Sequence, residues 1–143
     1  MFPLYALLAG TLIALQASVN AQLGVLLKSS VIATSVAFLL SAVISFTAIV
    51  VTSQSLPPVK TMVSIPAYFW MGGIVSALGV GLCYYLIPLM GVGSMMSYAL
   101  TGQLITAMVI AHFGLFGSVE MPLTFSKLLG ALAMMVGIIL INR

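Results

Sequence analysis

Gly93–Gly117, with the sequence GSMMSYALTGQLITAMVIAHFGLFG, is long enough to cross a bilayer as a helix, and it contains no Asp, Glu, Lys or Arg. A hydrocarbon core about 30 Å thick needs roughly 20 helical residues. Polar side chains nevertheless recur inside this apolar run: Ser94, Ser97, Tyr98, Thr101, Gln103 and Thr106. Each loses its water in the bilayer and needs a partner to offset a penalty of roughly a few kcal/mol. The stretch therefore predicts a membrane helix that lines a cavity.

The rest of the chain has the same apolar character. Hydrophobic residues make up 63% of the sequence and charged residues only 3%, against about 25% charged residues in soluble domains. We therefore expect residues 1–143 to form a single membrane domain. The basic residues are isolated from one another, so the positive net charge indicates no nucleic-acid-binding patch.

Five segments are long and apolar enough to predict membrane-spanning helices, and the predicted fold class is an all-α membrane protein. Pro3 opens the first segment, and Pro66 suits the first turn of the third. Pro88 and Gly91 are expected to end the third helix before the fourth begins. The predicted spans are residues 4–26, 32–52, 66–87, 93–111 and 125–141.

An odd number of spans places the two termini on opposite faces of the membrane. Lys28 and Arg143 then lie on one face, and Lys60 and Lys127 on the other. Because Lys and Arg in short loops set orientation, this two-against-two balance favours neither direction. The chain could insert both ways and pair with an inverted copy, or its loops could be too poor in charge for the rule to apply.

Amide side chains are the strongest candidates for a binding site, because an amide cannot satisfy its own donors and acceptor locally as a hydroxyl can. Gln16 and Asn20 are four residues apart, which puts them on one face of the first helix. They could line a cavity or hydrogen-bond to a neighbouring helix. Gln103 lies on a different face of the fourth helix from Tyr98 and is the residue there most expected to bind a solute.

For aromatic and hydroxyl side chains the sequence indicates a binding role less strongly than for the amides. Trp70 and Tyr84 lie near opposite ends of the third helix, where anchoring in the interfacial belt competes with a role in a pocket. Ser and Thr in the second helix are expected to bond the carbonyl of the preceding turn. The four-residue spacing of Gly73, Ala77 and Gly81 predicts a close helix contact, within the chain or between copies.

The sequence lacks the residue patterns of common catalytic and cofactor sites. It contains no pair of carboxylates, no cluster of metal ligands, no CxxC pair and no phosphate-binding loop. We expect no enzyme activity, no metal and no cofactor. His112, at a predicted helix end, is expected to be interfacial and non-catalytic.

Several short motifs, taken together in their order and spacing, resemble the small five-helix bacterial YdcZ-type proteins of the drug/metabolite transporter superfamily. The resemblance covers nearly the whole chain. The motifs are LQASVNAQL at Leu15–Leu23, WMGG at Trp70–Gly73, Ile87-Pro88, GQL at Gly102–Leu104 and HFGLFG at His112–Gly117.

This resemblance implies a multi-pass protein of the bacterial inner membrane, equal to one half of a ten-helix EamA-type exporter. Tandem duplication of a five-helix unit inverts the second copy, so a single unit would regain that fold as an antiparallel, dual-topology homodimer. A homologous, oppositely oriented subunit could replace the second copy. An acidic residue often precedes His-Phe-Gly in the family, whereas Ala111 stands here.

The sequence therefore predicts a secondary transporter, an exporter of small organic solutes, metabolites or drugs, that works by alternating access within membrane lipid. A dual-topology channel and a subunit without transport of its own are the alternatives. The residues expected to contact substrate are Gln16, Asn20, Trp70, Tyr84, Tyr98 and Gln103.

Overall fold

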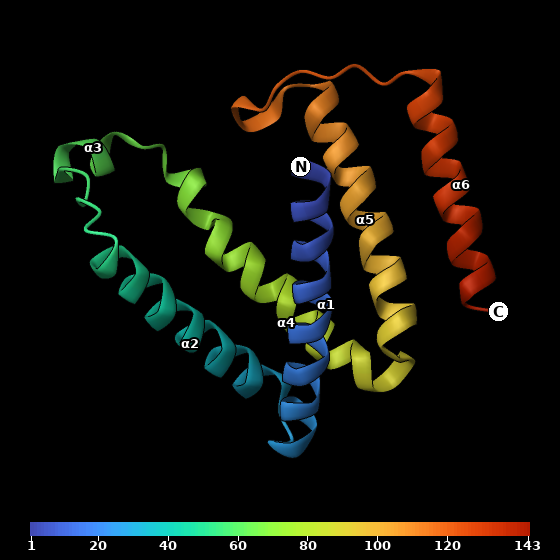
Figure 1. Ribbon diagram of the computed structural model, residues 1–143, viewed down its shortest axis with the longest axis horizontal. Coiled ribbons are helices and arrows are strands. Elements are labelled where there is room, and N and C mark those ends of the chain that lie inside the picture. The colour runs from blue at the N-terminus through green and yellow to red at the C-terminus, as the bar shows by residue number, and fades with distance from the viewer. The chain divides into compact units, whose positions relative to one another are not determined.

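The computed structural model describes residues 1–143, and its regular structure is entirely helical (Figure 1). Four helical segments are long and apolar enough to cross a membrane, and a fifth is apolar but shorter. This confirms the prediction of an all-helical chain with several apolar helices of membrane-spanning length. The chain divides into two compact units, an N-terminal unit, Met1–Leu89, and a C-terminal unit, Met90–Arg143.

The N-terminal unit contains three long helices, α1 (Phe2–Leu26), α2 (Ser30–Val51) and α4 (Gly72–Met90). Two short helical elements, α3 (Val59–Ser64) and the 3-10 helix η1 (Ala67–Met71), connect α2 to α4. Pro3 lies in the first turn of α1, where a missing backbone N–H costs no hydrogen bond. The Ser29 hydroxyl caps α2 by accepting a hydrogen bond from the Ile32 backbone N–H at 3.2 Å.

The prediction that Pro88 and Gly91 end α4 is wrong for Pro88 and confirmed for Gly91. The helix continues to Met90, with Pro88 in its last turn. The break comes one residue later, at Gly91, whose φ of 86° lies in the left-handed region that glycine adopts without steric cost.

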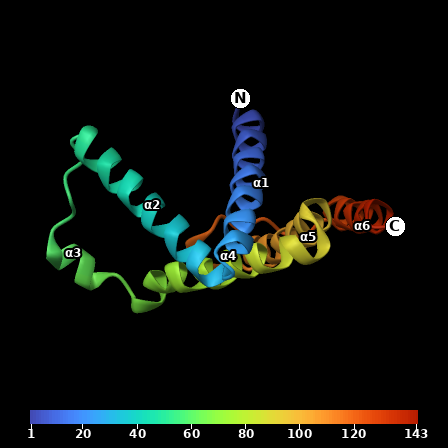
Figure 2. The ribbon, with the colours of Figure 1, turned by 90° about the horizontal axis from the view of Figure 1, so that it is seen from below.

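The three long helices of the N-terminal unit converge at one end, where α1 finishes, α2 begins and α4 finishes (Figures 1 and 2). Gly24 permits this approach, because a Cβ atom built there would lie 3.3 Å from the Ser30 Cα atom. Gly81 of α4 faces Thr34 of α2. A Cβ atom built on Gly81 would lie 3.5 Å from the Thr34 hydroxyl oxygen. Small residues at the crossing therefore replace bulky side chains and let the helices meet.

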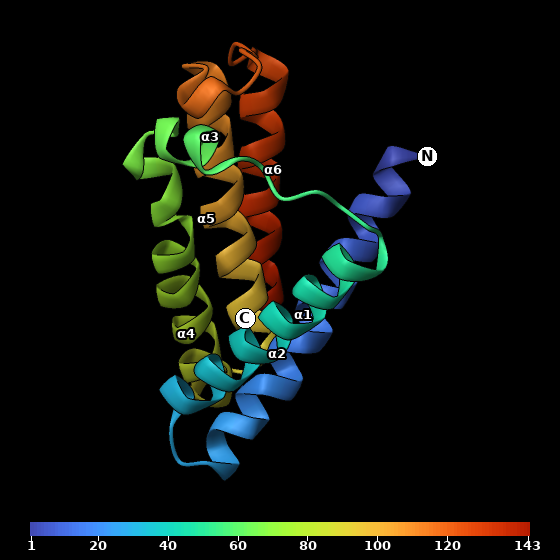
Figure 3. The same cartoon turned by 90° about the vertical axis from the view of Figure 1, so that its left-hand side faces the viewer.

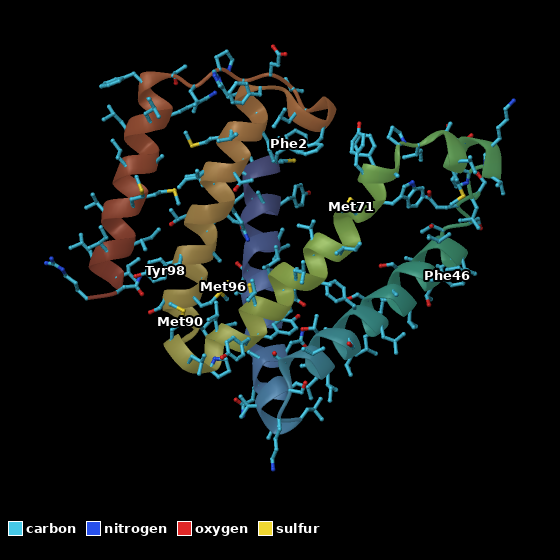
Figure 4. All side chains as sticks on the ribbon, turned by 180° about the vertical axis from the view of Figure 1, so that it is seen from behind. Phe2, Phe46, Met71, Met90, Met96 and Tyr98 are labelled. Atoms are coloured by element: carbon cyan, nitrogen blue, oxygen red, sulfur yellow. The ribbon has the colours of Figure 1, made fainter.

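Away from this crossing the helices spread apart and expose apolar side chains. Phe2 at the start of α1 and Phe46 in the second half of α2 are 87% and 63% exposed (Figure 4). Exposed apolar surface on this scale marks an interaction surface, and lipid is the natural solvent for helices of this composition.

The C-terminal unit is a helical hairpin of α5 (Val92–His112) and α6 (Phe125–Ile141), with the one-turn 3-10 helix η2 (Leu115–Gly117) in the connection. The two helices lie side by side (Figure 3). The connection folds back on the end of α5, where the Met121 N–H donates to the Ala111 carbonyl at 2.8 Å. The Thr124 hydroxyl caps α6.

In α2, the hydroxyls of Thr34, Ser35 and Thr47 bond the carbonyl of the preceding turn as predicted, whereas Ser41 and Ser45 make no hydrogen bond. Thr34 donates to the Ser30 carbonyl at 2.8 Å, and Thr47 donates to the Val43 carbonyl at 2.8 Å. These hydroxyls are satisfied locally and do not need a partner from another helix.

The close crossing at Gly24 predicts a specific sensitivity to side-chain size. Gly24→Leu should destabilise the N-terminal unit by about 1–3 kcal/mol, because the new side chain meets the Ser30 backbone. Gly10→Leu is the matched control on the same helix, since nothing lies within 4 Å of a Cβ there. Unfolding in mixed detergent micelles, followed by circular dichroism, measures the difference, and equal stabilities of the two variants would contradict this packing.

Candidate functional site

A hydrogen-bonded cluster of two amides and a phenol, Gln16, Asn20 and Tyr84, joins α1 to α4. The Asn20 Nδ2 group donates to the Tyr84 Oη atom at 2.9 Å and to the Gln16 Oε1 atom at 3.3 Å. The Tyr84 hydroxyl donates to the Gln16 Oε1 atom at 3.4 Å. We call these three residues the amide–phenol cluster.

The helix crossing positions this cluster. Ala17 and Ala21 bury the neighbouring face of α1, being 3% and 1% exposed. Tyr84 is 2% exposed and is the largest fully buried side chain of the chain. Of the two roles considered for Tyr84, anchoring in the interfacial belt does not fit, because the ring is enclosed by protein and its hydroxyl is hydrogen-bonded to Asn20.

Only some of the donors and acceptors in the amide–phenol cluster have hydrogen-bond partners within the N-terminal unit. An amide has two donor hydrogens on nitrogen and an accepting oxygen, and the Gln16 Nε2 group and the Asn20 Oδ1 atom have no hydrogen-bond partner there. Gln16 is exposed and Asn20 half-buried, so these groups can meet a ligand. Tyr84, in contrast, holds the two amides in place from the buried side.

A groove between α1 and α2 runs past these unpaired amide groups. Its volume is about 760 Å³, which lies within the range of roughly 300–1,000 Å³ found for small-molecule sites. Apolar side chains line most of it, and its polar contributors are Gln16, Asn20 and Ser41. Apolar walls with a few placed hydrogen-bonding groups are the usual composition of a small-molecule site.

The other residues predicted to contact substrate make no hydrogen bond to the amide–phenol cluster. Trp70 lies in η1, before α4 begins, and is 56% exposed. Tyr98 and Gln103 belong to the C-terminal unit, where Tyr98 is 54% exposed (Figure 4). Gln103 is exposed and makes no hydrogen bond, so its amide is free to bind another molecule.

A second polar contact, which the sequence did not indicate, ties the end of α6 to the start of α5. The Asn142 Nδ2 group donates to the Ser97 Oγ atom at 2.9 Å and to the Ile138 carbonyl at 2.8 Å. Ser97 in turn donates to the Ser94 carbonyl at 2.8 Å. Because Asn142 follows the last apolar residue, its sequence position indicates only a helix end. An amide at such an end can still bond across a hairpin.

His112 has a structural contact at the end of α5. Its Nδ1 atom accepts a hydrogen bond from the Leu123 backbone N–H at 3.3 Å, which helps hold the connection against the helix. The prediction of a non-catalytic role is consistent with this contact. No group of three or more His, Cys, Asp or Glu side chains is placed to hold a metal ion.

Membrane-length apolar helices with a groove that carries amide groups define a multi-helix membrane protein. The chain belongs to the YdcZ-type family of the drug/metabolite transporter superfamily. The family is described as "Putative inner membrane exporter, YdcZ", and it matches residues 1–140. That description concerns transport out of the cell across the inner membrane and names no catalytic activity. No curated protein and no solved structure matches the chain significantly.

Removing the Tyr84 hydroxyl should loosen the cluster without changing the packing of the ring. Tyr84→Phe is expected to destabilise the protein by roughly 0.5–2 kcal/mol, the range for interhelical hydrogen bonds in membranes. Tyr85→Phe, which alters the exposed neighbouring ring, should have almost no effect. A double-mutant cycle of Tyr84→Phe with Asn20→Leu, followed by unfolding in detergent, measures the coupling. Additive effects would show that this hydrogen bond contributes nothing.

Proposed function

We propose that the protein is a secondary transporter that exports small organic solutes from the cell by alternating access. The observation that carries this proposal is the groove between α1 and α2, with the partly satisfied amides of Gln16 and Asn20 on its wall. A structural hydrogen bond would not need unpaired donors and acceptors facing a hollow at membrane depth. The family's description as exporters supports the direction of transport.

The chemistry of the groove favours a neutral or weakly charged substrate. No Asp, Glu, Lys or Arg lines it, and the single acidic residue of the chain, Glu120, lies outside the predicted spans. An uncharged groove binds through hydrogen bonds and apolar contact, and it cannot offset the desolvation of a full charge. A substrate that presents a hydrogen-bond acceptor to Gln16 and a donor to Asn20 fits best.

The N-terminal unit by itself leaves the groove open on one side. We propose that an inverted second copy closes it, which builds a ten-helix transporter from two five-helix chains. Gln103, exposed and without a hydrogen bond, would then contribute to the shared cavity, together with Tyr98 or Trp70. The balance of Lys28 and Arg143 against Lys60 and Lys127 supports insertion in both orientations.

Transport is tested with proteoliposomes loaded with an equimolar mixture of neutral amides, polyols and nucleosides, whose efflux is measured by mass spectrometry. We expect saturable efflux of at least one component by the wild-type protein. Asn20→Leu should reduce that efflux about 10-fold or more, the effect of removing one or two good hydrogen bonds. Gln22→Leu, an equal change on the far side of α1, is the control and should transport normally.

The outcomes separate the competing functions. Efflux that rises linearly with concentration without saturating, at a high rate per protein molecule, would indicate a channel. No flux of any component, from protein shown to be folded, would indicate a subunit that depends on a larger complex. Normal transport by folded Gln103→Leu would remove Gln103 from the mechanism.

Orientation is tested by adding one positive charge at either end of a predicted span. Reporter fusions at the C-terminus of the natural chain should show both orientations in intact cells. Leu27→Arg and Gln54→Arg lie on opposite membrane faces and should shift the population in opposite directions, since the charge balance is even. A single orientation of the natural chain, unchanged by either substitution, would contradict the antiparallel dimer.

A further inference from the structure

A second hollow lies in the C-terminal unit, between α5 and α6. Its volume is about 460 Å³, and its only charged lining residue is Lys127. Met108, Met121 and Met134 supply flexible, polarisable walls that adapt to an irregular apolar occupant.

Small residues create this hollow. Ala107 and Ala111 on α5 and Gly130 and Ala131 on α6 line it. A Cβ atom built on Gly130 would meet no heavy atom within 4 Å. The gap is thus wide enough to receive added atoms without displacing either helix.

The hollow runs from the helix ends towards the middle of the hairpin. From Lys127 to Met134 is about two turns of α6, roughly 10 Å. The 17 residues of α6 extend for about 25 Å, somewhat less than a hydrocarbon core of about 30 Å. A short span of this kind places its terminal lysine at the boundary with the lipid headgroups, while the lysine stem stays in contact with apolar groups.

The Lys127 ammonium is available to an anion. Its Nζ atom donates to the Pro122 carbonyl at 2.9 Å, and it pairs with no carboxylate. An ammonium has three donor hydrogens, so two remain after the carbonyl contact. A positive charge at the mouth of an apolar hollow is complementary to a molecule with an anionic head and an apolar tail.

We propose that this hollow binds one acyl chain of an anionic phospholipid, whose phosphate contacts Lys127. The bilayer surrounds the two apolar helices and fills any open apolar groove with its own chains. Phosphatidylcholine carries the same phosphate, but its choline ammonium is repelled by Lys127, so a headgroup with a net negative charge is preferred. Lipid bound here would fill the gap left by Ala107, Ala111, Gly130 and Ala131 and stabilise the hairpin. This site is distinct from the groove beside Gln16 and Asn20, and it stands whether or not that groove transports a solute.

The test uses the full-length protein in nanodiscs of phosphatidylcholine with or without phosphatidylglycerol. After release into detergent, native mass spectrometry measures the phosphatidylglycerol retained per protomer. The wild-type protein should retain one molecule in preference to phosphatidylcholine. Lys127→Gln should weaken retention about 10-fold, the effect of losing a hydrogen bond to a charged group. Lys127→Arg should preserve retention.

Two matched controls separate this site from general effects of charge and folding. Lys60→Gln removes the same charge from α3 and should leave retention unchanged. Gly130→Leu fills the hollow and should abolish retention, whereas Gly137→Leu, equally free of neighbours within 4 Å but outside the hollow, should not. Equal losses from Lys127→Gln and Lys60→Gln, full retention by Gly130→Leu, or no lipid on the wild-type protein because another segment or copy covers the hollow, would each overturn the proposal.

Discussion

The absence of water around the helices is the constraint on which the rest of this structure depends. In a bilayer every polar group must find a partner within the protein or on a ligand. The bond from Asn20 to Tyr84 meets this requirement across two helices, and it does so where small residues let α1, α2 and α4 converge. The same requirement makes the unpaired groups of Gln16 and Asn20 informative, because groups left open at that depth are suited to bind another molecule.

Small residues have different structural effects in the two units. In the N-terminal unit, Gly24 and Gly81 bring helices into contact and so order the amide–phenol cluster. In the C-terminal unit, Gly130 has open space beside it, and the helices enclose a hollow instead. A small residue therefore permits either a close contact or a cavity, and the packing of the neighbouring helices decides which occurs.

Much of the fold could be predicted from composition and spacing. Long apolar segments with few charges fold as helices in a bilayer, since a helix satisfies its own backbone hydrogen bonds. Thr34 and Thr47 of α2 bond their own turns as predicted, because that interaction is local. The shared face of Gln16 and Asn20 was likewise evident from their spacing. The end of α4 was placed too early, at Ile87, because the left-handed Gly91 and not Pro88 ends the helix.

The sequence by itself determined the membrane class, the helical segments, the family and the amides of α1 as candidates, because these properties depend on local pattern and composition. Only the tertiary structure decided that Tyr84 is buried against Asn20 instead of lying at the lipid interface. It also decided that Asn142 bonds Ser97 and that Trp70 lies apart from the cluster. These contacts join residues far apart in the chain, and helix crossings, which no short sequence pattern encodes, bring such residues together.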